Sequence, residues 1–302
     1  MNQQFLTEIK TITAENRIFT DEPMKKHTTF RVGGPADILV QPKGTELAAV
    51  IRLCREYDVP YQVVGNGSNL LVGDRGIRGL VIEMLSKEDE ICVEDDCITV
   101  GAGVLLSKTA NRAAEHGLTG MEFAAGIPGS IGGAVVMNAG AYGGEMKDIL
   151  TAVTVLDQEG NEKILSVEEL EPGYRTSCIL KKGYIVTGVR IKLKHGEETA
   201  IRARMEELKK QRVEKQPLEY PSAGSTFKRP EGYFAGKLVM DAGLRGYQVG
   251  DAQVSEKHCG FVINRGNATA ADVRTLMQNV SDIVEEKFGV RLEPEVKMIG
   301  EF

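Results

Sequence analysis

A stretch near the middle of the chain, residues 120–144, is rich in glycine and alanine and carries one charged side chain, Glu122. Its glycines gather between positions 126 and 133, and Pro128 stiffens the turn among them. A main chain with so few side chains allows a ligand to approach it closely. The interspersed Pro, Ile and Val residues argue against a flexible linker. The segment therefore predicts a rigid, uncharged surface for an extended ligand.

A second loop, Gly65-Asn66-Gly67-Ser68-Asn69, lies between two apolar runs. Glycines free the backbone to turn several N–H groups toward one point, and the serine and asparagines add short donors. Such an arrangement suits an anion, and a pyrophosphate is the natural occupant. A plain hairpin turn is the alternative.

Composition narrows the class of protein. The chain has 302 residues, 42% hydrophobic and 26% charged, as is usual for a globular protein. Its net charge of −6 argues against a nucleic-acid or anionic-membrane partner. Five scattered cysteines without a C-x-x-C pattern favour reduced thiols, and the four histidines show no metal-ligand spacing. Without an apolar signal core or a run of 18 apolar residues, the chain is expected to be cytoplasmic.

Periodicity predicts an α+β protein of two domains. Complete G-x-G-x-x-G, P-loop and G-x-S-x-G motifs are absent. A change of composition near His195 predicts a boundary between 1–195 and 196–302. The predicted helices cover 45–57, 104–116, 199–216 and 270–288, and the predicted strands cover 36–40, 60–64, 77–84, 91–94, 98–100, 152–157, 162–165, 184–193 and 290–299.

Three short polar motifs suggest chemistry when they are taken together. Arg175 follows a turn, Ser225 lies in a small-residue loop just before two cations, and Glu295 interrupts an apolar segment. A carboxylate inside a predicted strand is a candidate for a perturbed pKa. Solvent exposure explains each motif if it is considered singly.

In their order along the chain, the motifs resemble the UDP-N-acetylenolpyruvoylglucosamine reductase family. The resemblance runs from the T-T-F-R-V-G-G segment at 28–34 to Glu295. Related flavoprotein oxidases share the G-N-G-S-N-L-L-V and G-I-P-G-S-I-G-G-A segments more loosely. The Y-R-x-S, G-S-x-F-K and E-P-E-V motifs at 174–177, 224–228 and 293–296 are more specific to the reductases.

The resemblance implies an FAD-binding domain of the vanillyl-alcohol-oxidase type in two subdomains, of about 1–76 and 77–195, followed by a C-terminal α+β substrate domain. It implies non-covalent FAD, NADPH as co-substrate, and Arg175, Ser225 and Glu295 as catalytic residues. The cofactor residues that it implies are Gly65, Asn66, Gly67, Ser68, Asn69, Leu70, Gly126, Pro128, Gly129, Ser130, Gly132, Gly133, Ala134, Asn138, Gly140 and Ala141. Proximity to the motifs suggests substrate contacts at Tyr174, Gln216, Lys228 and Arg229.

The implied reaction reduces the enolpyruvyl ether of a UDP-sugar, a small-molecule substrate, in peptidoglycan precursor synthesis, and the enzyme is expected to be a monomer. About fifty residues separate Arg175 from Ser225, which indicates the short-loop type. Arg175 and Glu295 polarise the substrate carboxylate, while Ser225 supplies a proton with the help of a cation such as Lys228. An FAD oxidase of the same fold and a non-catalytic nucleotide-binding module are the alternatives.

Overall fold

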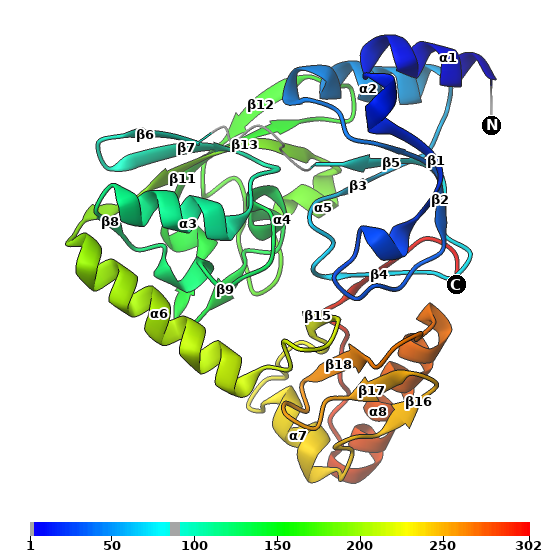
Figure 1. The fold of residues 1–302 in the computed structure, drawn as a ribbon, viewed down its shortest axis with the longest axis vertical. Helices are drawn as coiled ribbons and strands as arrows, with labels where there is room; N and C mark the ends of the chain where they lie inside the picture. Colours follow the sequence, from blue (N-terminus) through cyan, green and yellow to red (C-terminus); the bar gives the residue numbers. More distant parts are fainter. Residues whose placement is uncertain (1–2, 85–90) are drawn as a thin grey trace. The chain divides into compact units, whose positions relative to one another are not determined.

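The computed structural model describes residues 3–84 and 91–302 (Figure 1). The chain forms two compact units that alternate along the sequence. Unit 1 combines Met1–Phe19, Ile38–Asn66 and Gly79–Arg212, and unit 2 combines Thr20–Asp37, Gly67–Arg78 and Val213–Phe302. This division differs from the two contiguous domains that were expected to meet at residue 195. Those domain bounds stay a prediction.

A four-stranded sheet has the strand order β1-β2-β5-β3, in which β3 and β5 are parallel. Helix α2 buries Leu47, Val50, Ile51 and Cys54, the apolar positions that recur at helical spacing. Helix α1 lies beside α2 and buries Phe5 and Ile9 in the same core (Figure 1). The elements are β1 Ile18–Pro23, β2 Pro35–Val40, β3 Tyr61–Val64, β5 Ile77–Glu83, α1 Gln3–Ile12 and α2 Gly44–Glu56.

Unit 1 contains an antiparallel five-stranded sheet in the order β12-β11-β13-β7-β6. Helices α3 and α4 pack against it and share its apolar core (Figure 1). The strands are β6 Ile91–Glu94, β7 Cys97–Gly101, β11 Leu150–Leu156, β12 Glu162–Leu165 and β13 Ile185–Lys192. The helices are α3 Leu106–Glu115, α4 Ile131–Val136, α5 Cys178–Lys182 and α6 Glu198–Lys215, and the short strands are β8 Leu118–Thr119, β9 Gly140–Ala141, β10 Gly144–Glu145 and β14 Lys194–His195.

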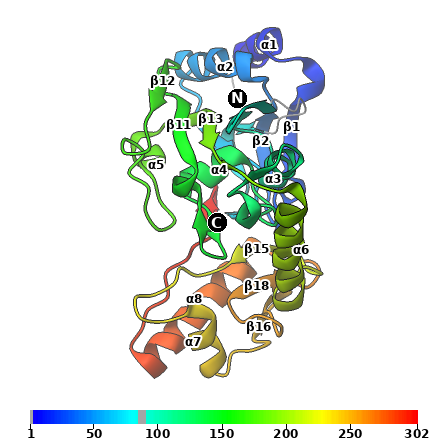
Figure 2. The ribbon, with the colours of Figure 1, turned by 90° about the vertical axis from the view of Figure 1, so that its left-hand side faces the viewer.

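Unit 2 contains an antiparallel sheet in the order β15-β18-β17-β16 and a separate parallel pair of β4 and β19. Helix α8 packs against β16, β17 and α7, and Figure 2 shows α8 beside α7. The elements are β4 Leu70–Val72, β15 Ser222–Ser225, β16 Gln248–Val249, β17 Ala252–Val254, β18 Phe261–Asn264, β19 Lys297–Ile299, α7 Ala235–Asp241 and α8 Ala270–Phe288.

Most predicted elements are confirmed, including the strands β11 and β12, which pair as a hairpin, and helix α8, which begins with a capping box of Thr269 with Asp272. The predicted strand over 290–299 is wrong, because only Lys297–Ile299 is a strand. Pro294 has no N–H for a ladder, so Glu295 lies in an irregular segment ahead of β19. The alternative of a hairpin turn at 65–69 is also wrong, since β3 and β4 belong to different sheets.

Candidate functional site

Two glycine-rich segments meet in unit 1. The side-chain amide of Asn66 donates to the carbonyl of Pro128 at 2.5 Å. A Cβ atom added to Gly65 would overlap the Oγ atom of Ser130, so only glycine permits this approach. The start of the first loop is thereby fixed against the second segment, as expected for two parts of one binding surface.

The segment from Gly126 to Ala134 has an exposed edge and a buried edge. Gly126, Pro128 and Gly133 are exposed, whereas Ser130 is buried and caps α4 by accepting from the N–H of Gly133 at 3.4 Å. Gly132 is also buried, and a Cβ atom there would lie 2.9 Å from the Cβ of Ala102. The exposed glycines therefore leave backbone open to a ligand, while Gly132 serves close packing between α4 and the turn after β7.

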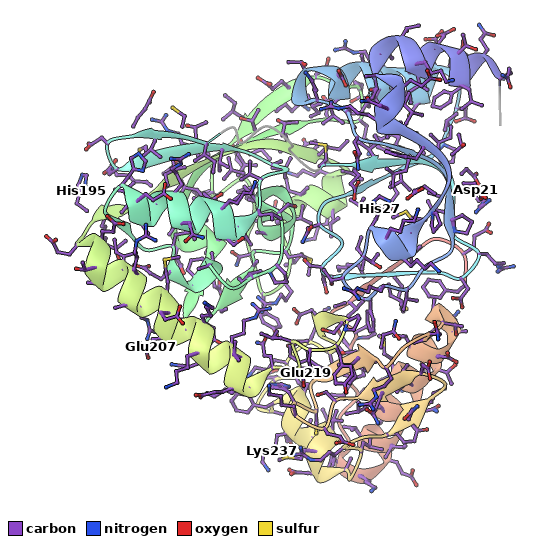
Figure 3. The ribbon with its side chains drawn as sticks, in the orientation of Figure 1. Asp21, His27, His195, Glu207, Glu219 and Lys237 are labelled. Carbon is purple, nitrogen blue, oxygen red and sulfur yellow. The ribbon has the colours of Figure 1, made fainter. Side chains whose placement is uncertain are left out.

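Arg212, a residue that the sequence did not single out, lies over this surface. Its Nη1 atom would be 3.3 Å from a Cβ atom on Gly126. Burial lowers the pKa of the Arg212 guanidinium. The residue lies in a charge-dense helix, so composition offered no signal that would separate it from its exposed neighbours, such as Glu207 (Figure 3). Arg212 supplies a cation to an otherwise uncharged surface.

The second half of the predicted anion loop belongs to unit 2. Gly67 has a φ of +61°, and a Cβ atom there would overlap the carbonyl oxygen of His27, which Figure 3 labels. The side-chain amide of Asn69 donates to the carbonyl of Glu295 at 3.2 Å, and Leu70 begins β4. This half of the loop is therefore attached to a predicted catalytic residue.

An open cavity of about 410 Å³ in unit 1 contains Arg175. It is lined by the hairpin of β9 and β10 and by Tyr174 and Arg175. The guanidinium of Arg175 donates to the carbonyl of Gly140 at 3.3 Å and lies 5.1 Å from the centre of the Tyr174 ring. Gly140 and Ala141, predicted as cofactor residues, thus share a cavity with a predicted catalytic cation.

Ser225 and Glu295 occur on neighbouring segments of unit 2. The N–H of Glu295 donates to the carbonyl of Thr226 at 2.8 Å, and the N–H of Lys228 donates to the carbonyl of Glu293 at the same distance. Ser225 is exposed and Glu295 is half-buried. The structure therefore brings together two of the three predicted catalytic residues, which are seventy positions apart in sequence.

The predicted substrate contacts have varied surroundings. The ammonium of Lys228 pairs with Glu293 at 3.0 Å, and Arg229 stacks on the ring of Phe234 at 3.9 Å. The side-chain oxygen of Gln216 is buried and accepts no hydrogen bond within the part of the chain that the structure describes. Tyr174 is exposed beside Arg175 in unit 1.

The residues of unit 1 fit the FAD that the resemblance implies. FAD is an elongated molecule with flat ring systems and an anionic pyrophosphate. The exposed backbone at Gly126 and Gly133 offers a surface without side chains, and Arg212 offers a positive charge beside it. Within residues 3–84 and 91–302, no group of three potential metal ligands occurs, and no helix is long and apolar enough to span a membrane.

Comparisons with known proteins agree with this arrangement. Residues 36–166 match a family model described as an FAD binding domain, and residues 216–299 match the C-terminal domain of UDP-N-acetylenolpyruvoylglucosamine reductase. These matches confirm the predicted α+β fold, in which an FAD-binding domain is followed by a C-terminal domain.

Whole-chain relatives give the same result. A UDP-N-acetylenolpyruvoylglucosamine reductase from Agathobacter rectalis is 57% identical over 100% of both chains, and one from Caldanaerobacter subterraneus is 51% identical over 100% of both. The crystal structure of the reductase from Thermus caldophilus superimposes with a TM-score of 0.78 at 42% identity, covering 91% of this chain and 97% of that one.

Proposed function

The chain belongs to the UDP-N-acetylenolpyruvoylglucosamine reductase family and is an FAD-dependent oxidoreductase, and we propose that it uses NADPH to reduce UDP-N-acetylglucosamine enolpyruvate to UDP-N-acetylmuramate. One observation carries the proposal most directly. The N–H of Glu295 donates to the carbonyl of Thr226, so the backbone of Glu295 lies next to the segment that carries Ser225, whose side chain is exposed. A non-catalytic nucleotide-binding module would have no use for that pair.

We propose that FAD is held non-covalently by the exposed backbone of Gly126–Ala134, the loop Gly65–Leu70 and the cation of Arg212. When bound, FAD accepts hydride from NADPH and supplies hydride to the methylene carbon of the enolpyruvyl group. The protein contributes binding, orientation and charge. A cytoplasmic, monomeric enzyme is part of the same proposal.

Arg175 is proposed to bind the carboxylate of the enolpyruvyl group. Hydride addition to the methylene carbon builds negative charge on the neighbouring carbon, and that charge spreads into the carboxylate. A guanidinium is always protonated and can bind both carboxylate oxygens at once. Because its donors are fixed before the reaction, such a cation stabilises the developing charge without reorganisation. Arg175 is already anchored on Gly140, which keeps its position defined.

Ser225 and Glu295 are proposed to complete the reaction from unit 2. Glu295, in its protonated form or through a water molecule, donates a hydrogen bond to the substrate carboxylate, and the hydroxyl of Ser225 protonates the carbon that carries the negative charge. A free hydroxyl is a weak acid at neutral pH, so a nearby cation is needed. Lys228 is three residues away and is already ion-paired with Glu293. A Lys228→Ala variant with undiminished turnover would remove Lys228 from this role.

The test is an anaerobic titration of the purified protein, followed by its visible spectrum. We expect the bands of oxidised flavin to bleach with NADPH and to return when UDP-N-acetylglucosamine enolpyruvate is added. Bleaching without return would leave a flavoprotein with another electron acceptor, such as an oxidase. A colourless protein that also fails to take up added FAD would contradict the proposal entirely.

A further inference from the structure

Asn138 is a buried residue next to the cavity of Arg175, and its side-chain amide is hydrogen-bonded to other protein groups. It is 2% exposed. The amide nitrogen donates to the carbonyl of Gly173 at 3.2 Å and to the carboxylate of Glu145 at 3.0 Å, and the amide oxygen accepts from the N–H of Lys147 at 2.9 Å. An asparagine amide has two N–H donors, and both are used here.

The orientation of this amide is fixed by its partners. A carbonyl and a carboxylate can only accept, and a backbone N–H can only donate. Turning the amide by 180° would set its oxygen against Gly173 and Glu145 and its nitrogen against the N–H of Lys147. Lys147 and Asn138 also hold the pKa of Glu145 below its usual value, with a smaller contribution from the charge of Arg175. Glu145 is therefore an ionised acceptor at neutral pH.

The backbone of Asn138, independently of its side chain, ends helix α4. It has a φ of +41° and follows the C-terminus of α4, where the N–H groups of Asn138 and Ala139 bond to the carbonyls of Val135 and Ala134. This is a Schellman motif, in which glycine or asparagine occupies the left-handed position. Glycine would satisfy the backbone alone, so the motif gives no reason for the side chain.

The turn that carries Arg175 is the partner of that side chain. Gly173 and Thr176 pair across the turn, and Arg175 has a φ of +55°, an unusual conformation for a residue other than glycine. A turn of this kind persists when its surroundings hold it. Asn138 holds it at the carbonyl of Gly173, and Ser177 donates to the carbonyl of Val136 at 2.9 Å. Both bonds tie the turn to the end of α4.

From these contacts we propose that Asn138, supported by Glu145, is a positioning residue for Arg175 and not a contact to the cofactor, as the resemblance had implied. The inference rests on the proposed role of Arg175. The amide fixes the first residue of the turn, while Gly140 anchors the guanidinium. Loss of the amide leaves the cation present but displaced, and a displacement of about 1 Å can lower a rate about 100-fold.

The test variant is Asn138→Gly, which keeps a residue suited to the left-handed position and deletes the amide. Asp58→Gly is the matched control. Asp58 has a φ of +51° at the end of α2, where the N–H groups of Asp58 and Val59 bond to Arg55 and Cys54 in the same pattern. Its side chain is exposed. The control therefore reports what glycine costs at such a position without a side-chain network.

Each protein is loaded with FAD, reduced by NADPH without oxygen, and mixed with UDP-N-acetylglucosamine enolpyruvate in a stopped-flow instrument. We expect Asn138→Gly to keep its FAD affinity and its rate of reduction, and to be reoxidised about 10- to 100-fold more slowly. Asp58→Gly should match the wild type in all three. Loss of FAD affinity or of reduction, with normal reoxidation of the flavin that remains bound, would make Asn138 a cofactor residue and overturn the proposal.

A double-mutant cycle separates positioning from general damage. If Asn138 acts through Arg175, Asn138→Gly will not slow reoxidation further in an Arg175→Ala background. Additive losses would overturn the proposal. A readout without substrate distinguishes its failure from failure of the proposed function: the guanidinium signals of Arg175 in ¹⁵N NMR should show restricted rotation in the wild type and free rotation in Asn138→Gly. Equal rotation in both proteins would contradict the positioning role, even for a protein that the nucleotide does not reoxidise.

Discussion

Arg175 in unit 1 and the Ser225–Glu295 pair in unit 2 are held in place by different kinds of bonds. The turn of Arg175 is closed by the backbone pair of Gly173 and Thr176, but it is the side chains of Asn138 and Ser177 that tie it to the end of α4. In unit 2 the backbone pairs Thr226–Glu295 and Lys228–Glu293 join the two segments, and Asn69 adds one side-chain bond to the carbonyl of Glu295. Side-chain bonds can be deleted one at a time, whereas backbone pairs survive most substitutions. We therefore expect the position of Arg175 to be the more sensitive of the two to mutation.

Within unit 1, the largest effect is expected at Arg175 itself. Arg175→Lys keeps the charge but loses the planar fork that can hold Gly140 and a carboxylate together. Loss of one preorganised donor typically lowers a rate by about 10²–10³-fold, and we expect that loss in the reoxidation of reduced flavin by the enolpyruvyl nucleotide. Stopped-flow absorbance measures it. If lysine sustained the wild-type rate, charge alone would suffice and the detailed positioning of Arg175 would be irrelevant.

A smaller effect is expected at Thr226, and it falls on stability. The hydroxyl of this buried residue accepts from the N–H of Val262 at 2.8 Å. Thr226→Val leaves that N–H without a partner, which costs about 1–3 kcal/mol of unfolding free energy. Because backbone pairs position Ser225 and Glu295, turnover of the folded variant should stay at the wild-type level. Urea denaturation measures the unfolding free energy, and steady-state kinetics on the same sample measure turnover. A large fall in turnover would contradict the claim that backbone pairs position Ser225 and Glu295.

The smallest effect is expected at Asp157, and it falls on the pH dependence of stability. A structure held by an ionisable side chain loses stability when that side chain is protonated. Its carboxylate accepts from the N–H groups of Asn161 and Glu159, which, with Lys163, lower its pKa from 3.8 to about 2. A lowered pKa adds stability that is present above pH 3.8 and is lost as the pH falls toward about 2. In Asp157→Asn this loss should be absent from the acid-denaturation curve. A variant with an unchanged curve would assign the acid sensitivity to other groups.

The sequence was informative where local patterns decide structure. Apolar residues at helical spacing predicted α2 and α8, and short runs with apolar residues predicted the strands β11 and β12. The short helix α4 escaped detection because its Ile-Gly-Gly-Ala-Val-Val sequence has two poor helix formers in six residues. Packing of Gly132 on Ala102 stabilises it, and that is a tertiary contact.

In the candidate site, too, local sequence patterns were informative and tertiary contacts were not predicted. The motifs identified Arg175, Ser225 and Glu295, but not the contacts that hold them. The resemblance implied that Asn138 contacts the cofactor. The hydrogen bonds of its buried amide, between the end of α4 and a distant turn, have no signature in the sequence. Arg212 was missed because nothing in a helix of alternating charges marks the one guanidinium that lies on Gly126.

The most direct test of the catalytic set is one rate constant, that of flavin reoxidation by UDP-N-acetylglucosamine enolpyruvate in Ser225→Ala. A proton donor typically contributes about 10²–10⁴-fold to the step that it serves. We predict that the variant will bind FAD and be reduced by NADPH as the wild type is, and that reoxidation will be slower by a factor in that range. Reoxidation of Ser225→Ala at the wild-type rate would contradict the account, because the pair of Ser225 and Glu295 would then have no part in the chemistry.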